Sequence, residues 1–190
     1  RGVYENIKNV IGFLLSGNMA GIFCVLYASL MALPAPFAAV HLLFINLLTD
    51  SLPAIAIGME PASSDLLNRK PRDPKEPLLS GDLVKRIGLQ GLLIAVPVMT
   101  AFYLGCRTGT AEAMTMAFAT LTLARLFHGF NCREDRSILR MGLSGNPASL
   151  AAFGVGVLLL LAVLLIPALH GLFLVADLTL AQLGMILGLA

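Results

Sequence analysis

Long apolar runs divide this chain into candidate membrane helices. Four runs of about 20 mainly apolar residues are clear. A fifth run is apolar except for Glu112 immediately before it and Arg125 and His128 inside it. The clear runs cover residues 11–33, 38–58, 87–105 and 149–170, and the weaker run covers 113–131. A sixth run begins near Leu178 and reaches Ala190, which is too short to cross a bilayer fully. The pattern predicts an all-α membrane protein, a bundle of about six transmembrane helices.

Composition and charge agree with this picture. Of the 190 residues, 57% are hydrophobic and 13% are charged, whereas a soluble domain carries about 25% charged residues. Apart from Arg107 and Arg125, every Lys and Arg lies before the first run, between or beside the second and third, or after the fifth. If 113–131 crosses the membrane, all of these positive charges lie on one side. The positive-inside rule makes that side the cytoplasm, so the N-terminus is predicted to be cytoplasmic and 113–131 to be a true span.

The chain is predicted to have four parts. Residues 1–10 form a polar stalk entering the first helix, 11–58 a helical hairpin, 59–82 a cytoplasmic loop, and 83–190 four further transmembrane helices, the last one truncated. The opening RGVYENIKNV lacks an initiator Met and is typical of a helix already under way, so we expect the chain to be cut at both ends. Segment 60–82 holds four prolines and many charges, which is typical of a solvated linker; a functional loop is the alternative.

A carboxylate lies inside the second apolar run, where a charge is costly and marks function by default. Asn46, Thr49 and Asp50 are spaced i, i+3, i+4 and therefore share one helix face. Their oxygens suit hard cations such as Ca²⁺ or Mg²⁺. Pro53 frees the carbonyl near Thr49, as in the half-unwound helices of transporter ion sites. We favour an ion site over a simple helix restart; Asn18, at similar depth, is either a further ligand or an interhelical hydrogen-bond partner.

Arg125 is the second anomaly within the apolar runs. Its guanidinium stays charged in proteins and needs a counter-charge or an aqueous path. Asp50 is the other formal charge deep in the predicted bilayer, so the two side chains are predicted to lie close together. The pair is either a structural ion pair or a fixed positive charge that fills a cation site, and the two interpretations are compatible. His128, three residues on, is either a packing histidine or a proton relay.

Three stretches carry a resemblance to a known family. These are NLLTDSLPAIAIGMEP at 46–61, RKPRDPKEPLLSGDLVKR at 69–86 and SGNMAG at 16–21. Together they resemble the C-terminal membrane half of P-type ATPases, and most closely the calcium-pump branch. The resemblance covers essentially the whole chain and implies transmembrane helices five to ten. It also implies that the 60–82 loop braces the stalk.

The resemblance implies a site for Ca²⁺ that departs from the two-ion pattern. Asn46 and Asp50 match the helix-six ligands of one site, which a helix-four Glu outside this chain completes. Asn18, Thr49 and Asp50 match ligands of the other site. Gly21 and Arg125 stand where that second site has Glu residues. Two carboxylates are gone and a positive charge has arrived, so one Ca²⁺ per cycle is predicted, held by Asn46 and Asp50.

The predicted function is therefore the ion-translocation half of an ATP-driven Ca²⁺ efflux pump. Ca²⁺ is the transported ion, and ATP and Mg²⁺ act only through the missing cytoplasmic domains, which also hold the catalytic residues. The expected partners are the lipid bilayer and the missing N-terminal membrane and cytoplasmic domains, with no nucleic acid. The expected location is a bacterial plasma membrane. A pump or exchanger for Mn²⁺ or Mg²⁺ is the alternative; an exchanger would carry a repeat-related second polar helix, and a structural subunit would have no use for Asp50 and Arg125 in lipid.

Overall fold

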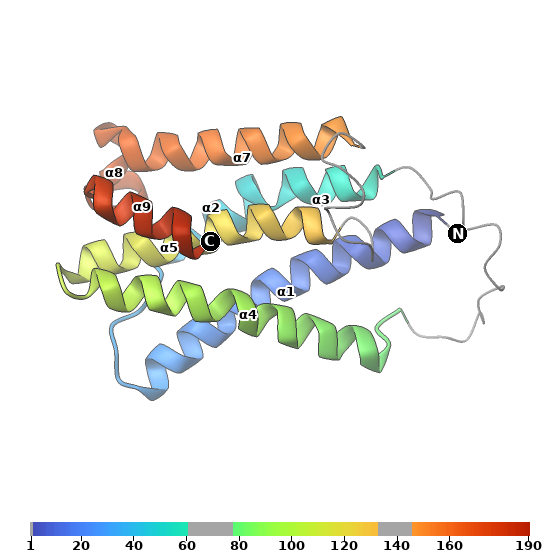
Figure 1. Ribbon diagram of the computed structural model, residues 1–190, viewed down its shortest axis with the longest axis horizontal. Helices are drawn as coiled ribbons and strands as arrows, with labels where there is room; N and C mark the ends of the chain where they lie inside the picture. The colour runs from blue at the N-terminus through green and yellow to red at the C-terminus, as the bar shows by residue number, and fades with distance from the viewer. Residues whose placement is uncertain (1, 61–77, 133–145) are drawn as a thin grey trace.

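The computed structural model describes residues 2–60, 78–132 and 146–190, and the described part is a bundle of helices along one long axis (Figure 1). In chain order the helices are α1 (Gly2–Leu30), α2 (Ala39–Phe44), a π-helical turn (Ile45–Thr49), α3 (Ser51–Gly58), α4 (Gly81–Gly105), α5 (Thr110–Asn131), α7 (Pro147–Leu165), α8 (Pro167–Phe173) and α9 (Leu180–Leu189). The described residues contain no strand. This confirms the predicted all-α class.

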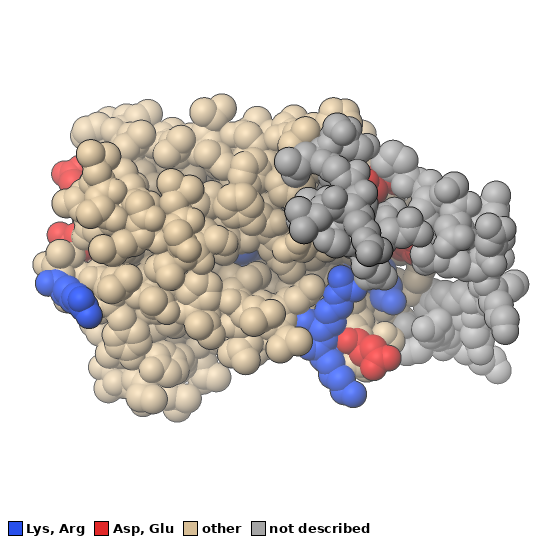
Figure 2. All heavy atoms as spheres, viewed as in Figure 1, with Lys and Arg blue, Asp and Glu red and all other residues tan. Residues whose placement is uncertain are grey.

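Four helical segments are long and apolar enough to cross a membrane: Gly2–Leu30, Ala39–Gly58, Gly81–Gly105 and Pro147–Leu165. They correspond to the four clear apolar runs of the sequence. On the face shown in Figure 2, the charged side chains gather at the two ends of the long axis, with an almost uncharged band between them. An uncharged band of this kind is what a lipid hydrocarbon core requires. The chain is a multi-pass integral membrane protein.

Helix α5, the weak fifth run, is the most enclosed helix of the bundle. It contacts α1, α3, α4, α7 and α9. Its buried polar side chains are Thr115, Thr120, Thr122, Arg125 and His128. Because neighbouring helices rather than lipid surround these side chains, the helix needs less apolar character than the outer ones. That is why its hydropathy is low although it runs through the centre of the bundle.

Helix boundaries agree with the sequence prediction at the start of the chain and differ from it in one later run. The first helix is continuous from Gly2, so the predicted stalk enters the first span as part of one helix of 29 residues. At 1.5 Å per residue this is roughly 44 Å, longer than the hydrocarbon core of roughly 30 Å, and one end must extend beyond the bilayer. The run 149–170 is broken, because Ile166 is extended before Pro167 starts α8.

The two ends of the bundle differ in what they hold. The inner end carries the start of α1, the end of α3 and the start of α4, and the charge bias predicts that it faces the cytoplasm. Most of the predicted 59–82 loop lies outside the described residues.

Between the ends, small residues let helices approach closely, as expected in membranes. A Cβ on Gly91 of α4 would lie only 2.8 Å from Met19 Cβ of α1.

Candidate cation site

The helix that carries the candidate ligands changes its winding just before Asp50. The Asp50 amide donates to the Ile45 carbonyl across five residues, at 2.8 Å, instead of the usual four. This is a π turn, a feature that often marks functional sites. The half-unwound segment expected around Thr49 is therefore a wider turn of a continuous helix. Pro53 lies in the first turn of α3, where its missing N–H costs little.

Asp50 and Arg125 form an ion pair, as the sequence predicted. Arg125 Nη2 donates to Asp50 Oδ2. The same nitrogen also donates to Asn18 Oδ1 at 3.3 Å. Asp50 is 1% exposed and Arg125 is 2% exposed. The guanidinium of Arg125, on α5, is thus hydrogen-bonded to α1 through Asn18 and to the start of α3 through Asp50.

The pair leaves polar atoms without partners. Asp50 Oδ1 and Arg125 Nε are buried and make no hydrogen bond within the described part of the chain. A buried polar atom that lacks a partner costs about 1 to 3 kcal/mol, and in a native structure such an atom calls for an explanation. A cation or a proton at Asp50 Oδ1 would satisfy the carboxylate. Oδ1 is therefore the atom of Asp50 that remains open to a further positive ligand.

The other predicted ligands differ in how exposed their side chains are. Thr49 is buried, and its hydroxyl donates to the Ile45 carbonyl at 3.0 Å. Asn46 is exposed on the surface of the described bundle, as is Asn18. A cation held by Asn46 and Asp50 together must therefore be enclosed from outside the described helices. Among the described residues, no three His, Cys, Asp or Glu side chains are grouped so that they could hold a metal ion.

Two glycines of α1 flank this region and have different surroundings. A Cβ on Gly17 would lie 2.5 Å from Arg125 Cζ and 2.6 Å from Nη2, so only glycine leaves room for the guanidinium. A Cβ on Gly21 would make an ordinary contact with Leu42 at 3.9 Å. Sequence reasoning identified Gly21 and missed Gly17. The adjacency of Gly17 to Asn18 was the available signal, and it is a weak one.

His128 belongs to a packed cluster one turn from Arg125. Its Nε2 is hydrogen-bonded to Ser16 Oγ at 2.8 Å and lies 3.2 Å from Cys132 Sγ. Phe13 stacks on the ring at 6.2 Å between centroids. These partners fit the packing interpretation of His128.

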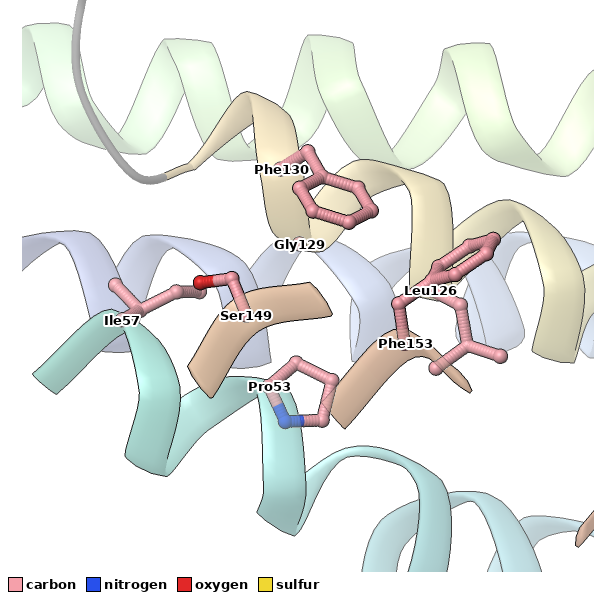
Figure 3. A pocket seen from close by; sticks show the side chains of 7 residues that line it. All are labelled: Pro53, Ile57, Leu126, Gly129, Phe130, Ser149 and Phe153. Carbon is pink, nitrogen blue, oxygen red and sulfur yellow. The ribbon is translucent and has the colours of Figure 1, made fainter. Parts of the chain in front are cut away.

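A small cavity lies beside the proline of the ion helix (Figure 3). Its volume is about 10 Å³, close to the space that one water molecule needs. Pro53 of α3, Phe130 of α5 and Phe153 of α7 line it, and Ser149 Oγ next to it has no partner among the described residues. A Cβ on Gly129 would lie 3.3 Å from Pro53 Cβ. The absence of a side chain at Gly129 thus lets α5 approach the first turn of α3 closely beside this cavity.

Comparison with known proteins identifies the family. A family model described as cation transporting ATPase, C-terminus, matches residues 34–190. The chain belongs to that family. This confirms the resemblance drawn from the NLLTDSLP and RKPRDPKEP stretches, and it makes Asp50 and Arg125 neighbouring residues in the membrane region of a cation-transporting ATPase.

Individual relatives cover the same region of longer proteins. The chain is 37% identical to a calcium-transporting ATPase of Bacillus subtilis (strain 168), over 100% of this chain and 22% of the relative. It is 39% identical to calcium-transporting ATPase 1 of Lactococcus lactis, over 80% of this chain and 17% of the relative. It is 29% identical to calcium-transporting ATPase type 2C member 1 of Mus musculus, over 100% of this chain and 21% of the relative. The chain thus spans about a fifth of the length of these relatives.

Proposed function

We propose that this chain is the ion-translocating membrane part of an ATP-driven Ca²⁺ efflux pump that carries one Ca²⁺ per cycle. The observation that carries the proposal is the buried pair of Asp50 and Arg125, with one carboxylate oxygen engaged and the other unpartnered. The similarity to proteins named calcium-transporting ATPases supports the choice of Ca²⁺. Mn²⁺ and Mg²⁺ also take oxygen ligands and are the alternative cargo.

Electrostatics limits the number of ions. Two unit charges about 4 Å apart interact by about 4 kcal/mol at an effective dielectric constant of 20. A divalent cation on the Arg125 side of Asp50 would meet repulsion of at least this order, and Gly21 offers no ligand there. The unpartnered Oδ1 of Asp50 remains available to a cation. One buried carboxylate beside a fixed positive charge supports a single divalent ion rather than two.

The remaining ligands and the chemistry come from other parts of the same pump. Asn46 at the surface of the described bundle requires a partner helix, and the family resemblance supplies a helix-four Glu in that role. ATP hydrolysis, with its Mg²⁺, belongs to domains upstream, and those domains and the lipid bilayer are the proposed partners. A bacterial plasma membrane is the proposed location. The proposed parts of the chain remain the stalk 1–10, the site hairpin 11–58, the loop 59–82 and the helices of 83–190.

Equilibrium binding of radioactive Ca²⁺ to the full-length pump tests this proposal. We expect one Ca²⁺ bound for each pump molecule at saturation. Two bound ions would contradict the role of Arg125, and saturable binding of Mn²⁺ with no binding of Ca²⁺ would replace the proposed cargo. A full-length protein that binds neither ion and shows no cation-dependent ATP hydrolysis would refute the pump itself.

A further inference from the structure

The inner end of α3 is held by two asparagine side chains from two different helices. A helix leaves its last carbonyl groups without intrahelical partners. Asn6 Nδ2 of α1 donates to Gly58 O at 3.1 Å and to Glu60 O at 2.8 Å. Asn146 Nδ2 donates to Ala56 O at 3.0 Å and to Glu60 Oε2 at 2.7 Å. We call Asn6 and Asn146 the amide clamp.

The two halves of the amide clamp come from different neighbours of α3. Asn6 lies near the beginning of α1, the helix that extends beyond the bilayer. Asn146 is the N-cap of α7, where its Oδ1 accepts a hydrogen bond from Ser149 N at 3.2 Å. The inner end of the ion helix is thus bonded to the stalk on one side and to α7 on the other.

Helix α3 connects the amide clamp directly to Asp50. It runs over eight residues, Ser51–Gly58, which is about 12 Å at 1.5 Å per residue. Asp50 lies immediately before its first residue. Along this length α1 packs beside α3 through an apolar cluster that includes Phe13 and Ile57. A displacement of the clamped end along the axis is therefore transmitted to Asp50 through one short, hydrogen-bonded helix.

The contacts between α1 and α3 differ in how well they resist sliding. Apolar contacts such as Phe13 with Ile57 are non-directional, so they tolerate a shift of one helix along the other. The hydrogen bonds from Asn6 to two carbonyls are directional and weaken steeply when their geometry changes. At the other end of α3, α1 reaches Asp50 through Asn18 and Arg125. At the inner end, the hydrogen bonds of Asn6 link α1 directly to the end of α3.

We propose that Asn6 is a positioning residue that couples movement of the stalk helix α1 to the cation site through α3. This proposal rests on the proposed function, because it requires that an upstream ATP-driven domain moves α1. In this account Asn6 touches no ion. It makes the inner end of α3 follow α1, so that Asp50 changes its position when the stalk does.

The test compares Asn6→Ala with Asn146→Ser in the full-length pump reconstituted in vesicles. Both variants remove the Nδ2 donors from the same end of α3, and serine at residue 146 keeps an N-cap acceptor for α7. The measured quantities are cations transported per ATP hydrolysed and the cation concentration for half-maximal ATP hydrolysis. We expect Asn6→Ala to lower the transport ratio clearly below that of the unaltered pump, because the two hydrogen bonds that make the end of α3 follow α1 are lost. Its half-maximal concentration stays that of the unaltered pump.

Asn146→Ser is the matched control and is expected to keep the transport ratio. An equal fall in both variants would overturn the proposal, since the clamp would then only stabilise α3. An unchanged ratio in Asn6→Ala would overturn it as well. If Asn6→Ala does not accumulate as folded protein, Asn6→Ser removes the long amide with a smaller change in polarity, and the same ratio decides.

Failure of the proposed function has a different signature. An unaltered pump that transports Mn²⁺ instead of Ca²⁺ overturns the cargo assignment, and the ratio is then measured with Mn²⁺. An unaltered protein that transports no cation overturns the pump. Hydrogen exchange of the backbone amides of residues 55–60 tests the Asn6 contact itself without transport. Faster exchange is expected in Asn6→Ala, and unchanged exchange contradicts the link.

Discussion

Arg125 reaches Asp50 by lying across the backbone of Gly17, so the ion pair at the centre of the bundle depends on a glycine of a third helix. The Nη2 atom of Arg125 donates to the Asp50 carboxylate and to Asn18, and a Cβ on Gly17 would stand 2.6 Å from that nitrogen. This relationship connects α1, α3 and α5 at the depth where an ion would bind. Our predictions begin from it.

Replacing Gly17 with Ala is predicted to displace the guanidinium and destabilise the protein. Overpacking a tight buried site costs about 1 to 3 kcal/mol, and the displaced Arg125 also loses its carboxylate partner. The free energy of unfolding of the detergent-solubilised pump measures the effect. Gly21→Ala is the control, because its Cβ meets only Leu42 at 3.9 Å, and we expect a change within about 0.5 kcal/mol. Equal effects of the two substitutions would contradict the assignment.

Replacing Arg125 with Gln is predicted to leave Asp50 as a buried, unpaired charge. Breaking a buried pair by removing one partner costs about 3 to 5 kcal/mol. Unfolding is measured in the presence of a chelator, so that no added cation replaces the guanidinium. Arg107→Gln is the control, because Arg107 is exposed at the outer end of the bundle and should change stability by less than about 0.5 kcal/mol. A stable Arg125→Gln protein under these conditions would show that Asp50 has another partner.

Converting two positions to carboxylates is predicted to create a second cation site. Arg125→Glu combined with Gly21→Glu removes the fixed positive charge and adds two acidic ligands near Asn18, Thr49 and Asp50. A Cβ on Gly21 meets only Leu42, at 3.9 Å, so this position tolerates the start of a side chain. We expect Ca²⁺ binding to rise from one ion per pump to two, measured at equilibrium with radioactive Ca²⁺. Arg125→Glu alone is the control; one ion in the double variant would mean that the fixed charge does not exclude the second ion.

The pump is also predicted to return fewer than two protons for each Ca²⁺ that it transports. The family resemblance implies that related pumps return protons through vacated carboxylates; here Gly21 and Arg125 replace two of these carboxylates, and Arg125 is a permanent cation. A pH-sensitive dye inside sealed vesicles measures the protons moved during ATP-driven Ca²⁺ transport. A ratio of two or more protons per Ca²⁺ would refute this prediction.

Much of the fold could be predicted because lipid imposes strong constraints on sequence. The apolar runs located α1, α4 and the hairpin, and the cost of charge in a bilayer singled out Asp50 and Arg125 as partners. Because each of these two charges has few other possible partners inside the apolar runs, their contact could be predicted from the sequence alone. The span predicted for residues 113–131 rested less directly on the charge bias on either side of it, and a helix, α5, lies there; that the other helices enclose it was not predicted.

Other features depend on contacts between distant segments and had no local signal. The π turn at Ile45–Thr49 and the clamp between Asn6 and the end of α3 each involve groups that the sequence does not mark. In the sequence, nothing distinguishes Gly17 from the other small residues of a membrane helix. Only the structure shows that Arg125 lies against it. Asn46 was expected on a shared face with Thr49 and Asp50, yet it is exposed while they are buried, because that side of the helix has no neighbour among the described residues.

The most direct test of the central claim is Ca²⁺-dependent ATP hydrolysis and Ca²⁺ transport by the full-length pump, compared with its Asp50→Asn variant. Asparagine keeps the shape of the side chain and removes the single buried carboxylate that faces the proposed ion. The account predicts that Ca²⁺ transport is lost in Asp50→Asn and that ATP hydrolysis no longer responds to Ca²⁺. Undiminished Ca²⁺ transport by this variant would contradict it.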